Sequence, residues 1–382
     1  MIFWGVFYGI IICLTSIMFV LDVTYKKRVM LLIVCGTILV SGFRHDIGAD
    51  FHTYQSMYEI FANGDIDTNV MIEPSFIWIS YVLGTLGFNF QMIFLFYAIV
   101  SIYGIYYGLK EYFGDLYIGI GIAFLLFLAY NSPGGFWWSM NAIRQAAALG
   151  IVFAGSSFLY SNRIKHFLLS VSVACFFHYS AVLAVFMVVF ARHQFRRKYV
   201  FAIVAMSFVA SYAGLSQNMI ISIMASMAEM TGKYVPAFWL LDTEGGNFTA
   251  SSYLYLLMYL FAFFILSRYS EKIQIVFNFS TVYIVIRILT SFSLEGSVIH
   301  HLLHRFEVYY LPFFFIYISK GLLCFVQKCK PSRIGQWIVI LFLSLFTFIT
   351  LENIAATGGE DTVFIKSKGT ENVTYDYNID LF

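Results

Sequence analysis

The chain has 382 residues, of which 60% are hydrophobic and only 12% are charged, and its formal net charge is +2 at pH 7. Soluble domains carry about 25% charged residues, so soluble enzymes, secreted scaffolds and disordered proteins are excluded and a membrane protein is indicated. The nearly neutral charge implies no nucleic-acid partner, and the five Cys form no paired framework for disulfides or zinc.

Apolar runs predict the membrane-spanning helices, because a helix needs about 20 apolar residues to cross the hydrocarbon. Stretches without Asp, Glu, Lys or Arg are Ile2–Leu21, Val29–Phe43, Pro74–Leu109, Leu116–Ile143, Ala146–Asn162, Phe167–Ala191, Tyr199–Ala228, Asn247–Ser267, Ile273–Ile286, Val308–Ser319 and Ile334–Leu351. With the longer runs divided, the sequence predicts an all-α polytopic bundle of about 10–12 transmembrane helices. We expect one transmembrane domain over residues 1–382, because no polar stretch is long enough for a soluble domain.

The basic residues predict the orientation, because short basic loops stay in the cytoplasm. Most of them fall in five clusters, at residues 26–28, 163–165, 192–198, 268–272 and 328–333. With these clusters inside, the acidic residues lie mainly outside. Three outer polar segments follow, namely a first loop at 45–73, a second loop at 229–250 and a C-terminal tail at 352–382.

Two apolar runs are predicted to be interrupted, because one crossing each would break the alternation of sides. Pro74–Leu109 is expected to contain a partial helix that turns back between Gly84 and Asn89. Phe167–Ala191 joins two basic clusters and is too short for two full spans. We therefore expect a re-entrant or broken helix pair around His178, since irregular backbone at membrane depth is tolerated where it lines a protein cavity.

Isolated basic residues on the predicted outer face point to an anionic ligand. They are Arg44, Arg144, Arg287 and Arg305, together with His178 and the group His300, His301 and His304. Arg287 lies deepest, about 21 Å along a helix from Ile273, where an unpaired charge is costly. These arginines either pair with carboxylates such as Asp46, Glu295 and Glu307, or bind phosphate oxygens through their guanidinium forks. A shared phosphate or pyrophosphate site is the functional hypothesis.

Acidic residues near Arg44 offer a proton acceptor. Asp46 and Asp50 lie in the polar stretch Ser41–Tyr54, where one carboxylate would orient Arg44 while the other takes a proton, or both would simply solvate the loop. His178 is either a satisfied core residue, or a base or phosphate donor. No cofactor is expected; a divalent cation at Asp65 and Asp67 is the minor alternative to a plain turn.

These residues resemble the EpsG and Wzy class of bacterial polysaccharide polymerases. The stretch RHDIGADFHTY is similar to that family's early motif, through Arg44, Gly48, Asp50 and Tyr54. Later family positions resemble Glu73-Pro74, Ile143-Arg144-Gln145-Ala146, Phe177-His178-Tyr179-Ser180-Ala181, and Arg305 with Tyr309.

The resemblance implies a GT-C-like glycosyltransferase in the bacterial inner membrane, with its active site on the outer, periplasmic side. It would polymerise undecaprenyl-pyrophosphate-linked repeat units into O-antigen, capsule or exopolysaccharide. Arg144, Arg287 and Arg305 would hold the pyrophosphate, with Gln145, His304, Tyr54 and Tyr309 as further substrate-binding residues. Asp50 or His178 would activate the acceptor hydroxyl, with Arg44 beside Asp50. Expected partners are lipid-linked glycans, membrane lipids and a chain-length regulator.

Two other classes of membrane protein remain as alternatives. A transporter or flippase of lipid-linked sugars also has many spans, but alternating access favours internal repeats and ionisable residues near the midplane. A membrane acyltransferase would use His178, but its thioester donor is expected at the cytoplasmic face, whereas the candidate residues map outside.

Overall fold

The computed structural model describes residues 2–48, 50–65, 72–130, 134–212, 250–266, 270–291, 298–329 and 331–356. Helices form throughout these residues, and none of them is in a strand. Five helices are long and apolar enough to span a membrane, namely Gln91–Phe113, Ile143–Tyr160, Lys272–Ser291, Leu311–Lys328 and Ser332–Glu352. Five shorter apolar helices accompany them, at Ile2–Ile17, Tyr117–Ala129, Ile164–Phe177, Tyr179–Arg192 and Ser252–Ile265. The predicted all-α polytopic membrane bundle is confirmed.

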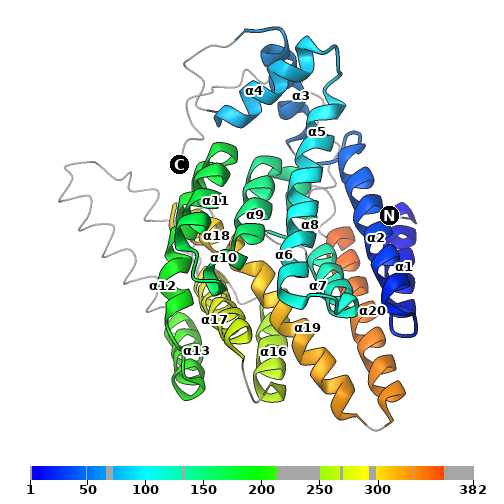
Figure 1. Cartoon of the computed structure of the whole chain (residues 1–382), viewed down its shortest axis with the longest axis vertical. Helices are drawn as coiled ribbons and strands as arrows, with labels where there is room; N and C mark the ends of the chain where they lie inside the picture. Colours follow the sequence, from blue (N-terminus) through cyan, green and yellow to red (C-terminus); the bar gives the residue numbers. More distant parts are fainter. Residues whose placement is uncertain are drawn as a thin grey trace, which may run out of the picture. The chain divides into compact units, whose positions relative to one another are not determined.

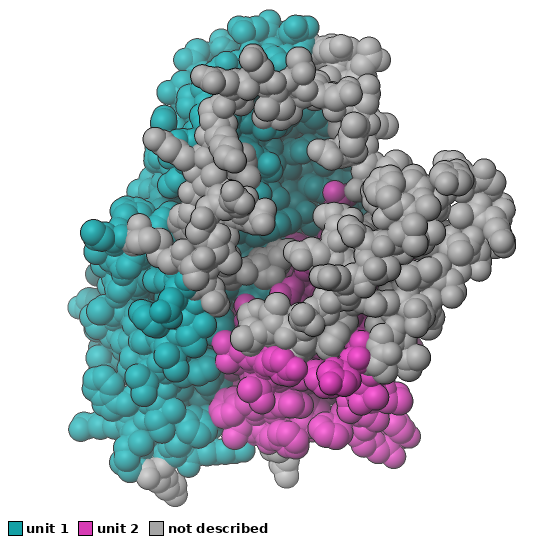
Figure 2. Space-filling model, turned by 180° about the vertical axis from the view of Figure 1, so that it is seen from behind, with its two compact units in different colours: residues 1–185, 322–382 teal, residues 186–321 magenta. Residues whose placement is uncertain are grey.

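The helices group into two compact units, which Figure 2 shows in different colours. Unit 1 comprises Met1–Val185 and Leu322–Phe382, and unit 2 comprises Phe186–Gly321. This partition describes packing within the chain, and the single transmembrane domain over residues 1–382 stays a prediction. The second outer loop, apart from its last residue, and the tail beyond residue 356 lie outside the described residues.

Unit 1 is built around α9, which contacts α6 on one side and α11 on another (Figure 1). Its elements are α1 (Ile2–Ile17), α2 (Val23–Gly42), α3 (Phe51–Ala62), α4 (Pro74–Thr85), α5 (Gln91–Ala98), η1 (Ile99–Tyr103), α6 (Gly104–Phe113), α7 (Tyr117–Ala129), α8 (Phe136–Asn141), α9 (Ile143–Gly155), α10 (Ser157–Tyr160), α11 (Ile164–Phe177), the start of η2 (Tyr179–Phe186), the end of α19 (Leu311–Lys328) and α20 (Ser332–Ala356). Gly104 and Gly150 let α6 and α9 touch, because a Cβ on Gly104 would lie 2.7 Å from the Gly150 backbone. Only glycine permits so close an approach.

The predicted first outer loop, residues 45–73, contains the helix α3. Its aromatic side chains recur every three or four residues, at Phe51, Tyr54, Tyr58 and Phe61, and all four are buried. This spacing places them on one face of a helix, where they pack with α4 and α5. The segment between the first spans thus contains a helix, and its place on the outer side stays a prediction.

Both predicted interruptions are present. α4 ends at Thr85, and Gly87 with φ +76° makes the turn that leads into α5. α11 ends at Phe177, His178 has extended backbone, and the chain continues as the 3-10 helix η2 and then α12 (Met187–Arg192). The broken helix around His178 is confirmed.

Unit 2 is built around α17, which contacts α12, α13, α16 and α18. The elements not yet given are α13 (Arg197–Tyr212), α16 (Ala250–Ile265), α17 (Glu271–Ser291) and α18 (Val298–Val308). Polar side chains tie its chain segments together: Asn278 donates to the Phe190 carbonyl at 2.8 Å, and Arg197 donates to the carbonyls of Phe263 and Leu266. These bonds satisfy backbone oxygens left open at helix ends.

Candidate functional site

The first candidate site gathers at the N-terminus of α9 in unit 1. We call Glu73, Arg144 and His178 the Glu73 cluster. Glu73 precedes Pro74 at the start of α4 and is buried; its Oε2 accepts a hydrogen bond from Arg144 Nη1. Its Oε1 lies 3.7 Å from His178 Nδ1. A buried carboxylate is stable when it is paired, so Glu73 orients the Arg144 guanidinium.

The backbone break beside His178 sets the tautomer of its ring. The Ser180 amide donates to His178 Nδ1 at 3.1 Å, so Nδ1 supplies a lone pair and the proton of the neutral ring sits on Nε2. The broken helix thereby makes His178 a hydrogen-bond donor at Nε2. A donor is suited to an anionic oxygen and is not suited to removing a proton from a hydroxyl.

Two adjacent donors at this helix start have no hydrogen-bond partner among the described residues. They are Arg144 Nε and Gln145 Nε2, both buried, and Gln145 as a residue is only 3% exposed. Buried donors without a partner are rare because each loses its bonds to water. The first amide groups of a helix also attract anions. Donors of this kind, at the start of a helix, are chemically suited to an anionic ligand.

Tyr54 and Asp50 belong to the surroundings of the same cluster. The Arg144 guanidinium carbon lies 5.8 Å from the centre of the Tyr54 ring, and the Tyr54 side chain is buried. Burial raises the pKa of Tyr54, the Arg144 charge lowers it, and the Asp50 charge raises it. Asp50 itself is half-buried at the start of α3, and its amide donates to Asn141 Oδ1 at 3.0 Å.

Arg44 is bound by backbone carbonyls, whereas Arg144 is paired with a carboxylate. Its three donor nitrogens reach the carbonyls of Ser41 at 2.7 Å, Ile47 at 3.1 Å and Met140 at 2.7 Å, and its guanidinium carbon lies 4.3 Å from the Phe94 ring centre. The side chain is 4% exposed, and burial lowers its pKa. Arg44 therefore fastens the chain after α2 to α8. Its predicted catalytic part stays a prediction.

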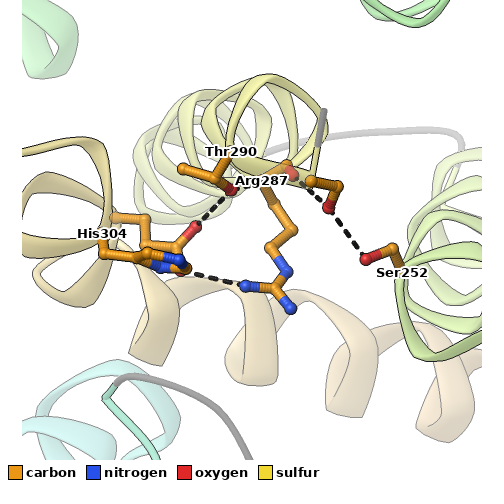
Figure 3. Close-up of polar contacts among 6 residues, drawn as sticks. Ser252, Arg287, Thr290 and His304 are labelled. Carbon is orange, nitrogen blue, oxygen red and sulfur yellow. Dashed lines mark hydrogen bonds and ion pairs between the residues drawn. The ribbon is translucent and has the colours of Figure 1, made fainter. Parts of the chain in front are cut away.

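Unit 2 holds a second cluster with the same groups, the Glu307 cluster of Arg287, His304, Glu307 and Thr290 (Figure 3). Glu307 is completely buried; its Oε1 accepts from Arg287 Nη1 at 3.2 Å and from His304 Nδ1 at 2.8 Å. Burial raises the pKa of Glu307, but the Arg287 charge and the His304 hydrogen bond lower it by more, so the carboxyl is ionised.

A chain of hydroxyl groups continues from this cluster across the helices. Thr290 Oγ1 lies 3.4 Å from Glu307 Oε2 and donates to the Arg287 carbonyl, which also accepts from Ser291. Ser291 in turn pairs with Ser252 of α16 at 2.8 Å (Figure 3). The Arg287 guanidinium carbon also lies 5.9 Å from the Tyr255 ring centre.

The structure brings the predicted site residues together in two groups. Arg144, Gln145, His178 and Tyr54 meet in unit 1, and Arg287 with His304 meets in unit 2. Arg305 is half-buried on α18 with no hydrogen bond or ion pair to the described residues, and Tyr309 is fully buried in the core of unit 2. The side chains of His300 and His301 lie outside the described residues. One anion site shared by all the arginines stays a prediction.

Sequence reasoning missed the two glutamates as site residues. Glu73 was noted only as a matching position, and Glu307 only as one of several pairing partners for arginines. A usable signal was present for Glu307, which is the single acidic residue between Val298 and Lys320. An acidic residue beside long apolar runs needs a buried counter-charge.

The described residues contain no group of three or more His, Cys, Asp or Glu side chains that would hold a metal ion. Of the two aspartates in the alternative cation site, Asp65 is described and Asp67 lies outside the described residues. The expectation of metal-independent chemistry stays a prediction.

Comparison with known proteins gives one match. The model of the EpsG family matches residues 27–362, which is most of the chain and includes both clusters. No curated protein and no solved structure matches the chain.

Proposed function

We propose a function from one premise: the chain belongs to the EpsG family. The family supports a polysaccharide polymerase of the glycosyltransferase type in general, embedded in the membrane by many helices. Our proposal is that the protein polymerises undecaprenyl-pyrophosphate-linked oligosaccharide repeat units into O-antigen, capsule or exopolysaccharide. The observation that carries it is the pair of unpartnered buried donors, Arg144 Nε and Gln145 Nε2, beside a glutamate that already neutralises Arg144.

The leaving group explains why a polymerase would use such a site. An acceptor sugar hydroxyl attacks the anomeric carbon of the growing chain, and the bond from that carbon to the lipid pyrophosphate breaks. The pyrophosphate gains negative charge as it leaves. Arg144, Gln145 and His178 Nε2 would donate to its oxygens, and fixed donors aimed at developing charge are a strong source of catalysis.

The base in this scheme is Asp50. Two candidates came from the sequence, and the Ser180 amide makes His178 a donor at Nε2. Asp50 is half-buried and close enough for its charge to act on Tyr54, which borders Arg144. The Asp50 carboxylate would take the proton of the attacking hydroxyl as the new glycosidic bond forms.

The Glu307 cluster would bind the pyrophosphate of the acceptor. Polymerisation joins two lipid-linked chains, so the protein must hold two pyrophosphates. Arg287 and His304, both fixed by the buried Glu307, offer the same kinds of donor as Arg144 and His178. Arg305, which has no ion pair within the described residues, would add a further charge there.

We place this reaction at the outer face of the bacterial inner membrane, because the basic clusters predict that α9 begins and α17 ends on that side. Partners would be the lipid-linked glycans, membrane lipids and a chain-length regulator. Neither nucleotide nor metal is needed, since the pyrophosphate is already an activated leaving group.

The test is polymer synthesis by the purified protein from undecaprenyl-pyrophosphate oligosaccharides, displayed as a ladder on a gel. We expect a ladder from the wild type, and single units only from Arg144→Gln. Arg196→Gln, which changes an exposed arginine of a basic loop, should give the wild-type ladder. No ladder from the wild type would overturn the proposal, and transport of the same lipids across liposomes by a protein that makes no polymer would favour the flippase.

A further inference from the structure

Unit 1 contains a cavity of about 710 Å³ beside the span that runs from α5 through η1 to α6. The π-helical segment η1 and α6 form one wall, and α9 with α10 forms the other. The inner wall is apolar or made of small residues, such as Val100, Gly104, Gly150, Ile151 and Ala154. Single π-helical turns inside α-helices occur often at functional sites, because they widen the helix locally.

The cavity opens sideways towards the surface of the bundle. Ile99, Tyr103 and Tyr107 line it, and each of these side chains is more than 40% exposed. In a membrane-spanning bundle such a surface faces lipid, so an apolar chain already dissolved in the bilayer can enter without crossing water.

The cavity and the Glu73 cluster lie along the same helix, α9. Val100 lines the cavity and also packs against the core group that contains Tyr54, Tyr97 and Ile143, the residue before Arg144. Gly150 lies six residues after Arg144 on α9, which is about 9 Å along the helix axis. The apolar cavity wall on α9 therefore begins about 9 Å along the helix from an anionic group held at Arg144.

We propose that this cavity binds the polyprenyl tail of the lipid-linked substrate whose pyrophosphate is held by the Glu73 cluster. This inference rests on the proposed function and adds the binding site of the lipid portion. An anionic head attached to a long apolar chain matches the order of the two features along α9, donors first and apolar wall next. The far end of the cavity is polar, with Tyr160 Oη donating to Glu111 Oε2 at 3.3 Å, and it marks the depth that the tail reaches.

A phospholipid of the opposite leaflet is the rival occupant, with its phosphate at Arg163. Arg163 is exposed and lines the same polar end. Glu111 lines the same end and would repel a phosphate, so its charge there favours a neutral tail end over an anionic head.

The first test needs no variant. The full-length protein in nanodiscs would be labelled with undecaprenyl phosphate that carries a diazirine on its tail, and the labelled peptides would be sequenced. We expect label on η1, α6 and α9, displaced by unlabelled undecaprenyl pyrophosphate about tenfold more effectively than by phosphatidylglycerol. Label elsewhere, or equal displacement by phosphatidylglycerol, would overturn the proposal.

The second test fills the cavity. Ala154→Phe places a ring inside it, and the matched control Ala205→Phe makes the same change at an exposed position of α13. We expect Ala154→Phe to raise KM about tenfold for a substrate with an undecaprenyl tail and to leave KM unchanged for the same oligosaccharide on a geranyl tail. Equal effects on both substrates would refute a tail site.

These outcomes separate the tail site from the proposed function. Tail label in the cavity without any polymer synthesis would leave the site standing and remove the polymerase. Polymer synthesis with tail label elsewhere would support the polymerase and remove the tail site. Thermal unfolding checks that Ala154→Phe is folded. If the variant is unfolded, the labelling of the wild type alone tests whether the cavity binds the tail.

Discussion

Among single residues, the buried Arg44 stabilises the fold through its hydrogen bonds. Its guanidinium satisfies three carbonyls, including that of Met140, far along the chain. Gly48 belongs to the same contact, because its φ is +105° and a Cβ at this position would lie 3.2 Å from the Met140 carbonyl oxygen, which leaves little room for a side chain. The stretch that resembles a family motif thus holds the chain after α2 against α8, and it also contains Asp50.

We therefore predict that Arg44→Gln destabilises the protein and does not abolish its chemistry. Loss of the charged donors should lower the free energy of unfolding by about 2 kcal/mol. Thermal unfolding in detergent measures this, with the exposed Arg28→Gln on α2 as the control. Polymer yield per folded molecule should be retained; wild-type stability combined with lost activity would instead place Arg44 in catalysis.

Glu307 gives a prediction for pH. Its pKa in the folded protein lies below the ordinary value of 4.5, so its ion pairs stabilise the fold above that pH and are lost as the pH falls through the folded pKa. The midpoint of thermal unfolding should therefore drop on acidification below about pH 4.5 more steeply in the wild type than in Glu307→Gln. Parallel curves for the two proteins would contradict the assigned pairing.

Several candidate residues were predictable from the sequence, because a charged side chain within the membrane is costly and needs a partner or a function. Arg144, Arg287 and His178 stood out because apolar runs surround them, and His304 stood out as one of a histidine group on the predicted outer face. Which partners they share was not predictable, because Glu73 and Arg144 are 71 positions apart in the chain and meet only in the fold, where α4 contacts α11 and α11 contacts α9. A pattern in one sequence does not fix such contacts.

At the scale of elements, the interruption of α11 is the feature that links fold to site. The break was predictable because the run Phe167–Ala191 joins two basic clusters and is too short to cross twice. The hydrogen bond that results from it was not, because only the folded chain brings the Ser180 N–H to His178 Nδ1. α3 is a contrasting case. Its aromatic residues recur with a helical period in the sequence, but the polar residues between them favoured a loop.

We predict that Ser180→Pro impairs polymerisation while Ser180→Ala does not. Proline removes the amide hydrogen that holds His178 as an Nε2–H donor, and it is tolerated in the first turn of a helix such as η2. The alanine variant keeps that hydrogen. Polymer synthesis should fall about tenfold in the proline variant only, which corresponds to the loss of one good donor. Equal rates in both variants would show that the tautomer of His178 is irrelevant.

At the scale of the whole molecule, the same local arrangement occurs in each unit. In both, a buried glutamate pairs with one arginine and lies beside one histidine. An aromatic ring lies about 6 Å from each guanidinium, Tyr54 in unit 1 and Tyr255 in unit 2. The two clusters differ in the histidine: Nδ1 of His178 accepts from an amide, whereas Nδ1 of His304 donates to Glu307. Each unit thus holds one arginine, one histidine and one buried glutamate close together, all from its own part of the chain.

Two such groups predict two pyrophosphate sites per chain. Titration of the full-length protein with farnesyl pyrophosphate, followed by native mass spectrometry or calorimetry, should show two bound molecules for the wild type and for Arg196→Gln. Arg144→Gln and Arg287→Gln should each retain one, because the other unit keeps its glutamate, histidine and arginine. Thermal unfolding checks that Arg287→Gln, which leaves Glu307 with His304 alone, is still folded. A single site in the wild type, or two sites in both arginine variants, would contradict this prediction. The ion pairs of the two clusters would then stabilise the fold of their units without binding pyrophosphate.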